Sequence, residues 1–83
     1  MNGAKKKIKV PKRYAAIIKI GNNPDGSARC LKYRFNDLIK FTKFLDEKWS
    51  EWLWHNVYYN KGENKGKQAG NFTKHKRPVT NRI

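Results

Sequence analysis

The sequence predicts a small α+β domain, in which one helix packs on one face of a small antiparallel sheet in the order β-β-α-β-β. Three observations favour this class. Apolar and polar residues alternate in two segments of the N-terminal half, apolar residues then recur at spacings of three and four, and a segment rich in aromatic residues follows. The 83 residues are enough for one such domain, and its core will be thin.

The first strand is expected at residues 13–20. Its apolar residues from Tyr14 to Ile20 keep the period of two that is typical of a strand with one buried face. Pro11 cannot donate a backbone hydrogen bond to a neighbouring strand. It therefore separates this strand from a short arm at residues 7–10.

A tight turn and a second strand follow, and together they predict a hairpin. In GNNPDGS, proline and glycine occupy positions that they favour in a type I turn. Residues 29–35 then alternate in the opposite phase. A four-residue loop places Asn22 opposite Ser27 and Ile18 opposite Leu31, which brings the apolar residues of both strands to one face.

The helix is expected at residues 36–50. Asn36 is a favourable N-cap, and Asp37 suits the positive end of the helix dipole. Apolar residues then form one face at helical spacing, in the series Leu38, Phe41, Leu45, Trp49 and Trp52. The two tryptophans that end this series are expected in the core.

Residues 52–59 allow two interpretations. A continued helix is one, but the aromatic and β-prone composition of WLWHNVYYN favours a third strand. In such a strand Trp52, Trp54 and Tyr58 share one face. The periodicity alone does not say which face is buried.

The rest of the chain is polar and basic. Residues 61–70 are expected to form a flexible basic loop, because they are rich in glycine, lysine and asparagine. A fourth strand is expected within residues 71–80, with Pro78 at an edge or at its end. Residues 1–6 and 80–83 are expected to be disordered, because the sequence offers them nothing to pack against.

The charge of the chain predicts an anionic partner. Lys and Arg number 20 against 6 Asp and Glu, a net charge of +14 that is concentrated towards the two ends of the chain. Nucleic acid is the most common partner of this kind, and an acidic protein surface is the next. A membrane partner is not expected, because no stretch approaches the roughly 18 apolar residues of a membrane-spanning helix.

The predicted site is the outer face of the sheet together with the basic arms. Its candidate nucleic-acid-binding residues are Lys7, Lys9, Arg13, Lys19, Lys32, Arg34, Trp54, Tyr58, Lys74, Lys76 and Arg77. Single-stranded DNA or RNA is favoured, because bases of single strands usually stack on aromatic residues beside Lys and Arg. A structural interpretation stands beside this one: the lysines solvate an open sheet face, and Trp54 fills the core.

Catalysis is not expected. Cys30, His55 and His75 are too few and too irregularly spaced for a zinc site. Outside the helix, Asp25 and Glu63 are too few to hold the metal of a nuclease. We therefore expect no enzyme, no cofactor and no metal. The single cysteine and the lack of a signal-peptide pattern predict a cytoplasmic location.

A second class of function stays open at this point. The small size, the many lysines and asparagines and the lack of a catalytic set also suit an inhibitor encoded by a phage or mobile element, of the anti-restriction or anti-CRISPR type. Such an inhibitor would bind an acidic or nucleic-acid-binding surface of a host protein complex. The sequence does not distinguish DNA from RNA, single from double strands, or a monomer from a weak dimer.

Overall fold

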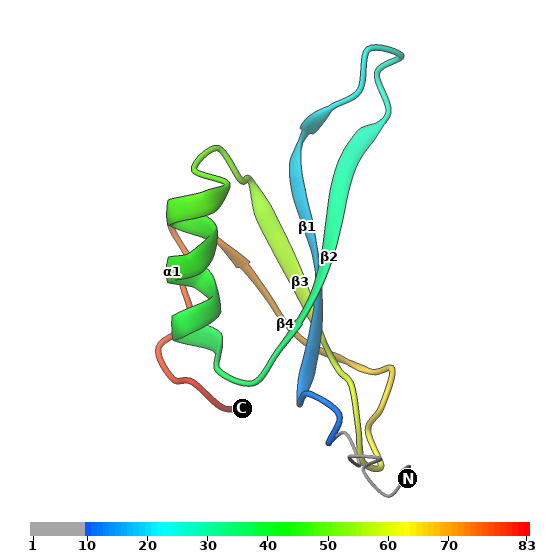
Figure 1. The fold of residues 1–83 in the computed structure, drawn as a ribbon, viewed down its shortest axis with the longest axis vertical. Helices are drawn as coiled ribbons and strands as arrows, with labels where there is room; N and C mark the ends of the chain where they lie inside the picture. The colour runs from blue at the N-terminus through cyan, green and yellow to red at the C-terminus, as the bar shows by residue number, and fades with distance from the viewer. Residues whose placement is uncertain (1–9) are drawn as a thin grey trace, which may run out of the picture.

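The computed structural model describes residues 10–83 and has the predicted α+β class. Its elements are β1 (Tyr14–Asn22), β2 (Ala28–Phe35), α1 (Leu38–Lys48), β3 (Trp54–Tyr59) and β4 (Gln68–Thr73). The strands form one antiparallel sheet in the order β2-β1-β3-β4. In Figure 1, α1 lies against one face of this sheet, and the β1–β2 hairpin extends beyond the helix.

The β1–β2 hairpin follows the predicted register except near its turn. A β-bulge between Lys19 and Gly21 shifts the pairing, so Asn22 lies opposite Ala28 and not opposite Ser27. The loop is one residue longer than predicted. The extra residue in the bulge of β1 and the extra residue in the loop offset each other. The pairs from Tyr14 and Phe35 to Lys19 and Cys30 therefore keep the predicted register.

The core lies between α1 and the sheet. Ala16 and Ile18 of β1 are fully buried, as are Leu38 and Leu45 of α1 and Val57 of β3. Aromatic rings fill the space around these aliphatic side chains. The closest ring pair is Phe35 at the end of β2 and Phe41 in the first turn of α1, which stack with centroids 4.0 Å apart. Aromatic residues thus supply much of the apolar area of this short chain.

The helix is shorter than predicted at both ends. It spans Leu38–Lys48, so Trp49 and Trp52 follow it in the loop that leads to β3. Trp49 is partly buried, and its Nε1–H donates a hydrogen bond to the Tyr33 hydroxyl at 2.9 Å. Trp52 is fully buried. Both therefore contribute to the core as expected, but Trp52 shares no strand face with Trp54, the first residue of β3.

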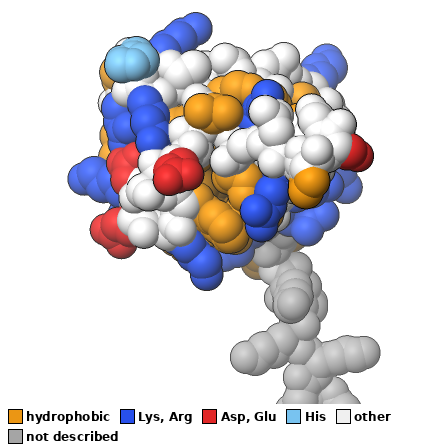
Figure 2. Space-filling model, turned by 90° about the horizontal axis from the view of Figure 1, so that it is seen from above, with side chains coloured by type: hydrophobic (Ala, Val, Ile, Leu, Met, Phe, Trp, Pro, Cys, Tyr) orange, Lys and Arg blue, Asp and Glu red, His pale blue; other side chains and the backbone are white. Residues whose placement is uncertain are grey.

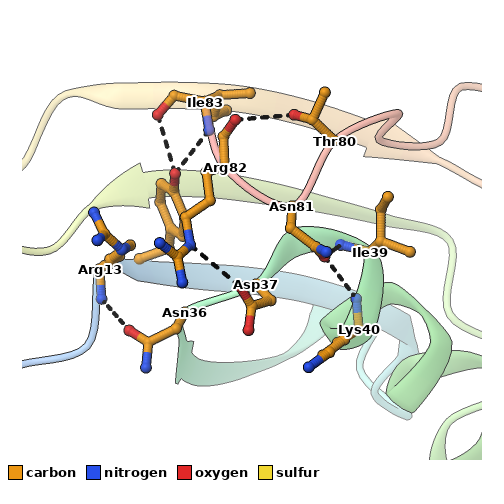
Figure 3. A network of polar contacts seen from close by, with 10 residues as sticks. Arg13, Asn36, Asp37, Ile39, Lys40, Thr80, Asn81, Arg82 and Ile83 are labelled. Atoms are coloured by element: carbon orange, nitrogen blue, oxygen red, sulfur yellow. Dashed lines mark hydrogen bonds and ion pairs between the residues drawn. The ribbon is translucent and has the colours of Figure 1, made fainter.

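The N-terminus of α1 is capped by a residue far away in the sequence. Asp37 occupies the N-cap position, but its side chain makes no capping hydrogen bond. The Asn81 side-chain oxygen instead accepts a hydrogen bond from the Ile39 N–H at 2.9 Å (Figure 3). Asn36, the predicted N-cap, accepts a hydrogen bond from the Arg13 N–H and joins the helix entry to β1. That prediction was wrong because acceptors for the first turn of a helix can come from any part of the chain.

Residues 80–83, expected to be disordered, are bound to both the helix and the sheet. Arg82 Nε lies 3.2 Å from Asp37 Oδ1 in an ion pair. The Ile83 N–H donates to the Tyr14 hydroxyl at 2.8 Å, and that hydroxyl donates to the Ile83 carbonyl oxygen at 3.0 Å. These contacts are polar and join distant residues. Local sequence patterns do not indicate contacts of this kind.

The last strand begins earlier than predicted. It spans Gln68–Thr73, so its last three residues fall within the predicted segment 71–80 and its first three come from the segment expected to be a flexible loop. The rest of that loop has a defined turn, in which the Gly66 N–H donates to the Tyr59 carbonyl oxygen at 2.8 Å. Gly62 and Gly66 have φ angles of 84° and 90°, a left-handed conformation that glycine adopts without strain.

His55 is a core residue on the helix-facing side of β3. It is 0% exposed. The Thr42 hydroxyl donates its proton to the Leu38 carbonyl oxygen at 2.9 Å and therefore accepts from His55 Nε2–H, which lies 3.3 Å away. His55 Nδ1 has no hydrogen-bond partner within residues 10–83. Burial, and to a lesser extent the positive charge of Arg77, lowers the pKa of His55 from 6.5 to about 4.

We expect Asn81→Ala to destabilise the fold by about 1 to 2 kcal/mol, because the first turn of α1 loses its cap. Urea denaturation followed by circular dichroism measures the change. Asn64→Ala is the matched control, since Asn64 is exposed in the β3–β4 loop and its side chain makes no hydrogen bond in residues 10–83. Equal losses in the two variants would contradict the capping role.

We expect the free energy of unfolding to fall by about 2 kcal/mol between pH 7.5 and pH 5. The folded chain holds His55 neutral down to a pKa of about 4, whereas the unfolded chain binds the proton near 6.5. The contribution of His55 is therefore complete above about pH 6.5 and is lost as the pH falls towards 4. Urea titrations across this pH range test the expectation. His55→Leu should remove this dependence and His75→Gln should keep it, and a dependence that survives His55→Leu would assign it to another group.

Candidate nucleic-acid interface

The face of the sheet opposite α1 is exposed to solvent, and we call it the open face (Figure 1). Strand alternation and register assign its side chains. They are Ala15, Ile17 and Lys19 of β1, Cys30, Lys32 and Arg34 of β2, Trp54, Asn56 and Tyr58 of β3, and Gln68, Asn71 and Thr73 of β4. No residue of this face is acidic.

The open-face side chains form rows that cross the strands. The rows are Cys30, Lys19, Trp54 and Thr73; Lys32, Ile17, Asn56 and Asn71; and Arg34, Ala15, Tyr58 and Gln68. Neighbouring strands lie about 4.8 Å apart, so residues next to each other in a row are in side-chain reach. The structure thus brings together Lys19, Lys32, Arg34, Trp54 and Tyr58 from the set predicted by sequence.

The position of Trp54 answers the question that periodicity left open. His55 and Val57 take the buried positions of β3, so Trp54 and Tyr58 point to the other side. Both aromatic side chains are partly buried among their neighbours on the open face. The alternative in which Trp54 fills the core is therefore wrong, and the core tryptophan of this segment is Trp52.

Other predicted site residues of the C-terminal segment lie on the helix side of the sheet. Arg77 Nη2 forms an ion pair of 2.5 Å with Asp46 Oδ2, and this contact lowers the pKa of Asp46 below its ordinary value. The Lys74 ammonium group donates to the Ser50 carbonyl oxygen and lies 5.7 Å from the centre of the Trp52 ring. These two cations therefore have structural partners away from the open face.

The remaining predicted residues are also apart from the open face. Lys76 is exposed, and its carbonyl oxygen accepts the Thr73 N–H beyond the end of β4. Arg13 is exposed just before β1, where it lines another hollow with Tyr14, Lys61 and Ile83. The predictions for Lys7 and Lys9 fall outside the described residues.

Sequence reasoning missed a second group of cations at the end of the open face. Lys12, Arg34, Lys61 and Lys65 line a hollow of about 840 Å³ together with Val10, Pro11, Asn60 and Gly62. We call it the basic hollow. Only Arg34 belonged to the predicted site. Two signals were available in the sequence: Lys12 interrupts the apolar alternation before β1, and Lys61 and Lys65 lie in the glycine-containing loop. No periodicity relates these positions to one another, because they belong to separate segments of the chain.

The cations of the open face and of the basic hollow form no ion pair within residues 10–83. The ion pairs of that part of the chain are Arg77 with Asp46 and Arg82 with Asp37, and both lie beside α1. The lining of the basic hollow, like the open face, contains no acidic residue. Figure 2 views the molecule from the other end, where the β1–β2 turn lies, and there acidic side chains stand among the Lys and Arg side chains. The cations of the basic hollow, which have no acidic residue in its lining, therefore suit anion binding.

The fold and this surface define a small basic α+β protein with a one-sided sheet. No family model, curated protein or solved structure matches the chain. Residues 10–83 contain no helix that is long and apolar enough to cross a membrane. They also contain no group of three or more His, Cys, Asp and Glu side chains that could hold a metal ion.

Proposed function

We propose that the protein binds single-stranded nucleic acid through the open face of its sheet. The observation that carries this proposal is the composition of the face, which combines Lys and Arg with Trp54 and Tyr58 on one surface without an acidic residue. Cations bind phosphates, and exposed rings stack on bases. A sheet face that only contacts water would carry both signs of charge.

The spacing of the two rings favours single strands over duplexes. Trp54 and Tyr58 are four residues apart on β3, which corresponds to about 13 Å along a strand. Bases stacked in a duplex rise by only about 3.4 Å per step. A ligand that stacks on both rings must therefore have separated, accessible bases, as an extended single strand does.

The same rings weigh against an acidic protein surface as the partner. Carboxylates would pair with Lys32 and Arg34, but they have no aromatic ring that could stack on Trp54 and Tyr58. Nucleic acid uses both parts of the open face. The inhibitor interpretation is therefore the weaker one, and it becomes the one to test if no nucleic acid binds.

We expect Lys32→Glu combined with Arg34→Glu to weaken binding to single-stranded oligonucleotides by at least about tenfold at low salt. The slope of log affinity against log salt concentration should fall by about 1.4, since each phosphate contact on a single strand contributes about 0.7. Fluorescence anisotropy with single-stranded and double-stranded DNA and RNA, each titrated with salt, measures both quantities.

The control for this experiment is Lys43→Glu combined with Lys48→Glu, which makes the same change in net charge on α1. Both side chains are exposed. This control should lose much less affinity than the open-face variant. Equal losses would mean that net charge alone governs binding, and absence of binding to all four polymers would refute the proposed function.

We expect a bound oligonucleotide to quench the fluorescence of Trp54, because this is the tryptophan on the open face. Trp54→Phe should lose most of the quenching seen in the parent chain, whereas Trp49→Phe should retain it, since Trp49 packs against the core. Steady-state fluorescence titration with an unlabelled oligonucleotide measures the effect. Quenching that is undiminished in Trp54→Phe would rule out Trp54 as the stacking platform.

A further inference from the structure

The basic hollow is a preformed concave site and not a chance gathering of long side chains. The Asn60 side chain donates to the Lys12 carbonyl oxygen at 3.0 Å, and the Asn60 N–H donates to the Arg13 carbonyl oxygen at 2.8 Å. These bonds fix the segment before β1 against the end of β3. Arg34 projects from β2, so the hollow is built from strands on both sides of β1.

The loop wall of the basic hollow is also fixed by backbone hydrogen bonds. The Lys65 N–H donates to the Gly62 carbonyl oxygen at 3.1 Å, and the Gly66 N–H donates to the Tyr59 carbonyl oxygen at 2.8 Å. Gly62 lines the hollow and has no side chain, and the space beside its Cα is open. Lys61 and Lys65 are therefore carried on a defined turn.

An apolar hollow adjoins the basic one on the open face. It has a volume of about 320 Å³, and Ala15, Ile17 and Tyr58 lie among its lining residues. Lys65 and Asn60 line both hollows. A planar apolar group on Tyr58 would thus place a linked anionic group among the cations. A nucleotide has both parts, a base and a phosphate.

The number of cations distinguishes a terminal phosphate from an internal one. A phosphodiester within a strand carries one negative charge, whereas a phosphate monoester carries about 1.5 to 2 at neutral pH. Lys12, Arg34, Lys61 and Lys65 surround one hollow without an acidic residue in its lining. Their mutual repulsion falls most when a dianion binds among them.

We infer that the basic hollow binds the terminal phosphate monoester of a nucleic-acid strand whose end base lies on Tyr58. This inference rests on the proposed function and adds that the chain prefers a strand end that carries a phosphate. The open face then holds the nucleotides that follow, along β3 towards Trp54.

The test compares three tetranucleotides of one sequence, with a 5′-phosphate, a 3′-phosphate or hydroxyl groups at both ends. Isothermal titration calorimetry measures their affinities for the chain. One of the two phosphorylated forms should bind at least about tenfold more tightly than the form with hydroxyl ends, because hydrogen bonds to charged groups are the stronger ones. Comparison of the two phosphorylated forms identifies the end.

Matched variants assign the effect to the basic hollow. Lys61→Ala combined with Lys65→Ala should abolish the preference for a terminal phosphate, and Lys43→Ala combined with Lys48→Ala should preserve it. Equal affinity for the three tetranucleotides, or a preference that survives the first pair of substitutions, would overturn the inference but leave the proposed function intact. If the chain binds none of the tetranucleotides, and binds no single-stranded oligonucleotide of greater length, both the inference and the proposed function are overturned.

Discussion

The structure depends on the alternation of side chains along β1. This strand is hydrogen-bonded to β2 on one side and to β3 on the other, so its phase fixes the faces of both neighbours. Ala16 and Ile18 point to α1 and are fully buried, and this leaves Ile17 and Lys19 on the open face. A slip of one residue would exchange the two faces and expose the core. Core and open face are therefore products of one pattern.

One helix of 11 residues cannot satisfy a four-stranded sheet alone, and the C-terminal segment makes up part of the difference. Asn81 caps α1, Arg82 pairs with its N-cap residue, and Ile83 is bound to the hydroxyl of Tyr14 on β1. The ion pair between Arg77 and Asp46 joins the same segment to the last turns of the helix. Polar contacts thus hold the helix against the sheet where apolar area is scarce.

Features that depend on local periodicity could be predicted from the sequence, and features that depend on distant partners could not. The alternation of apolar residues along β1 and β2 predicts which side chains face the helix, and it correctly places Lys32 and Arg34 on the open face. The Asn81 cap and the basic hollow are formed by residues from separate parts of the chain. No spacing rule relates such residues. For Trp54, the alternation along the strand is compatible with either face of the sheet. The burial of His55 and Val57 on the helix side places Trp54 on the open face.

Folding also sorts the charges of the chain. Asp37 and Asp46 neutralise Arg82 and Arg77 beside the helix, so acidic side chains that could have screened the open face are used to hold the fold together. The cations of the open face and the basic hollow are left to repel one another, which costs stability. A bound polyanion removes this repulsion only in the folded chain, because only the folded chain gathers these cations. Ligand binding and stability are therefore coupled by mass action. The proposed ligand would complete the electrostatic balance that the acidic residues of the chain do not supply.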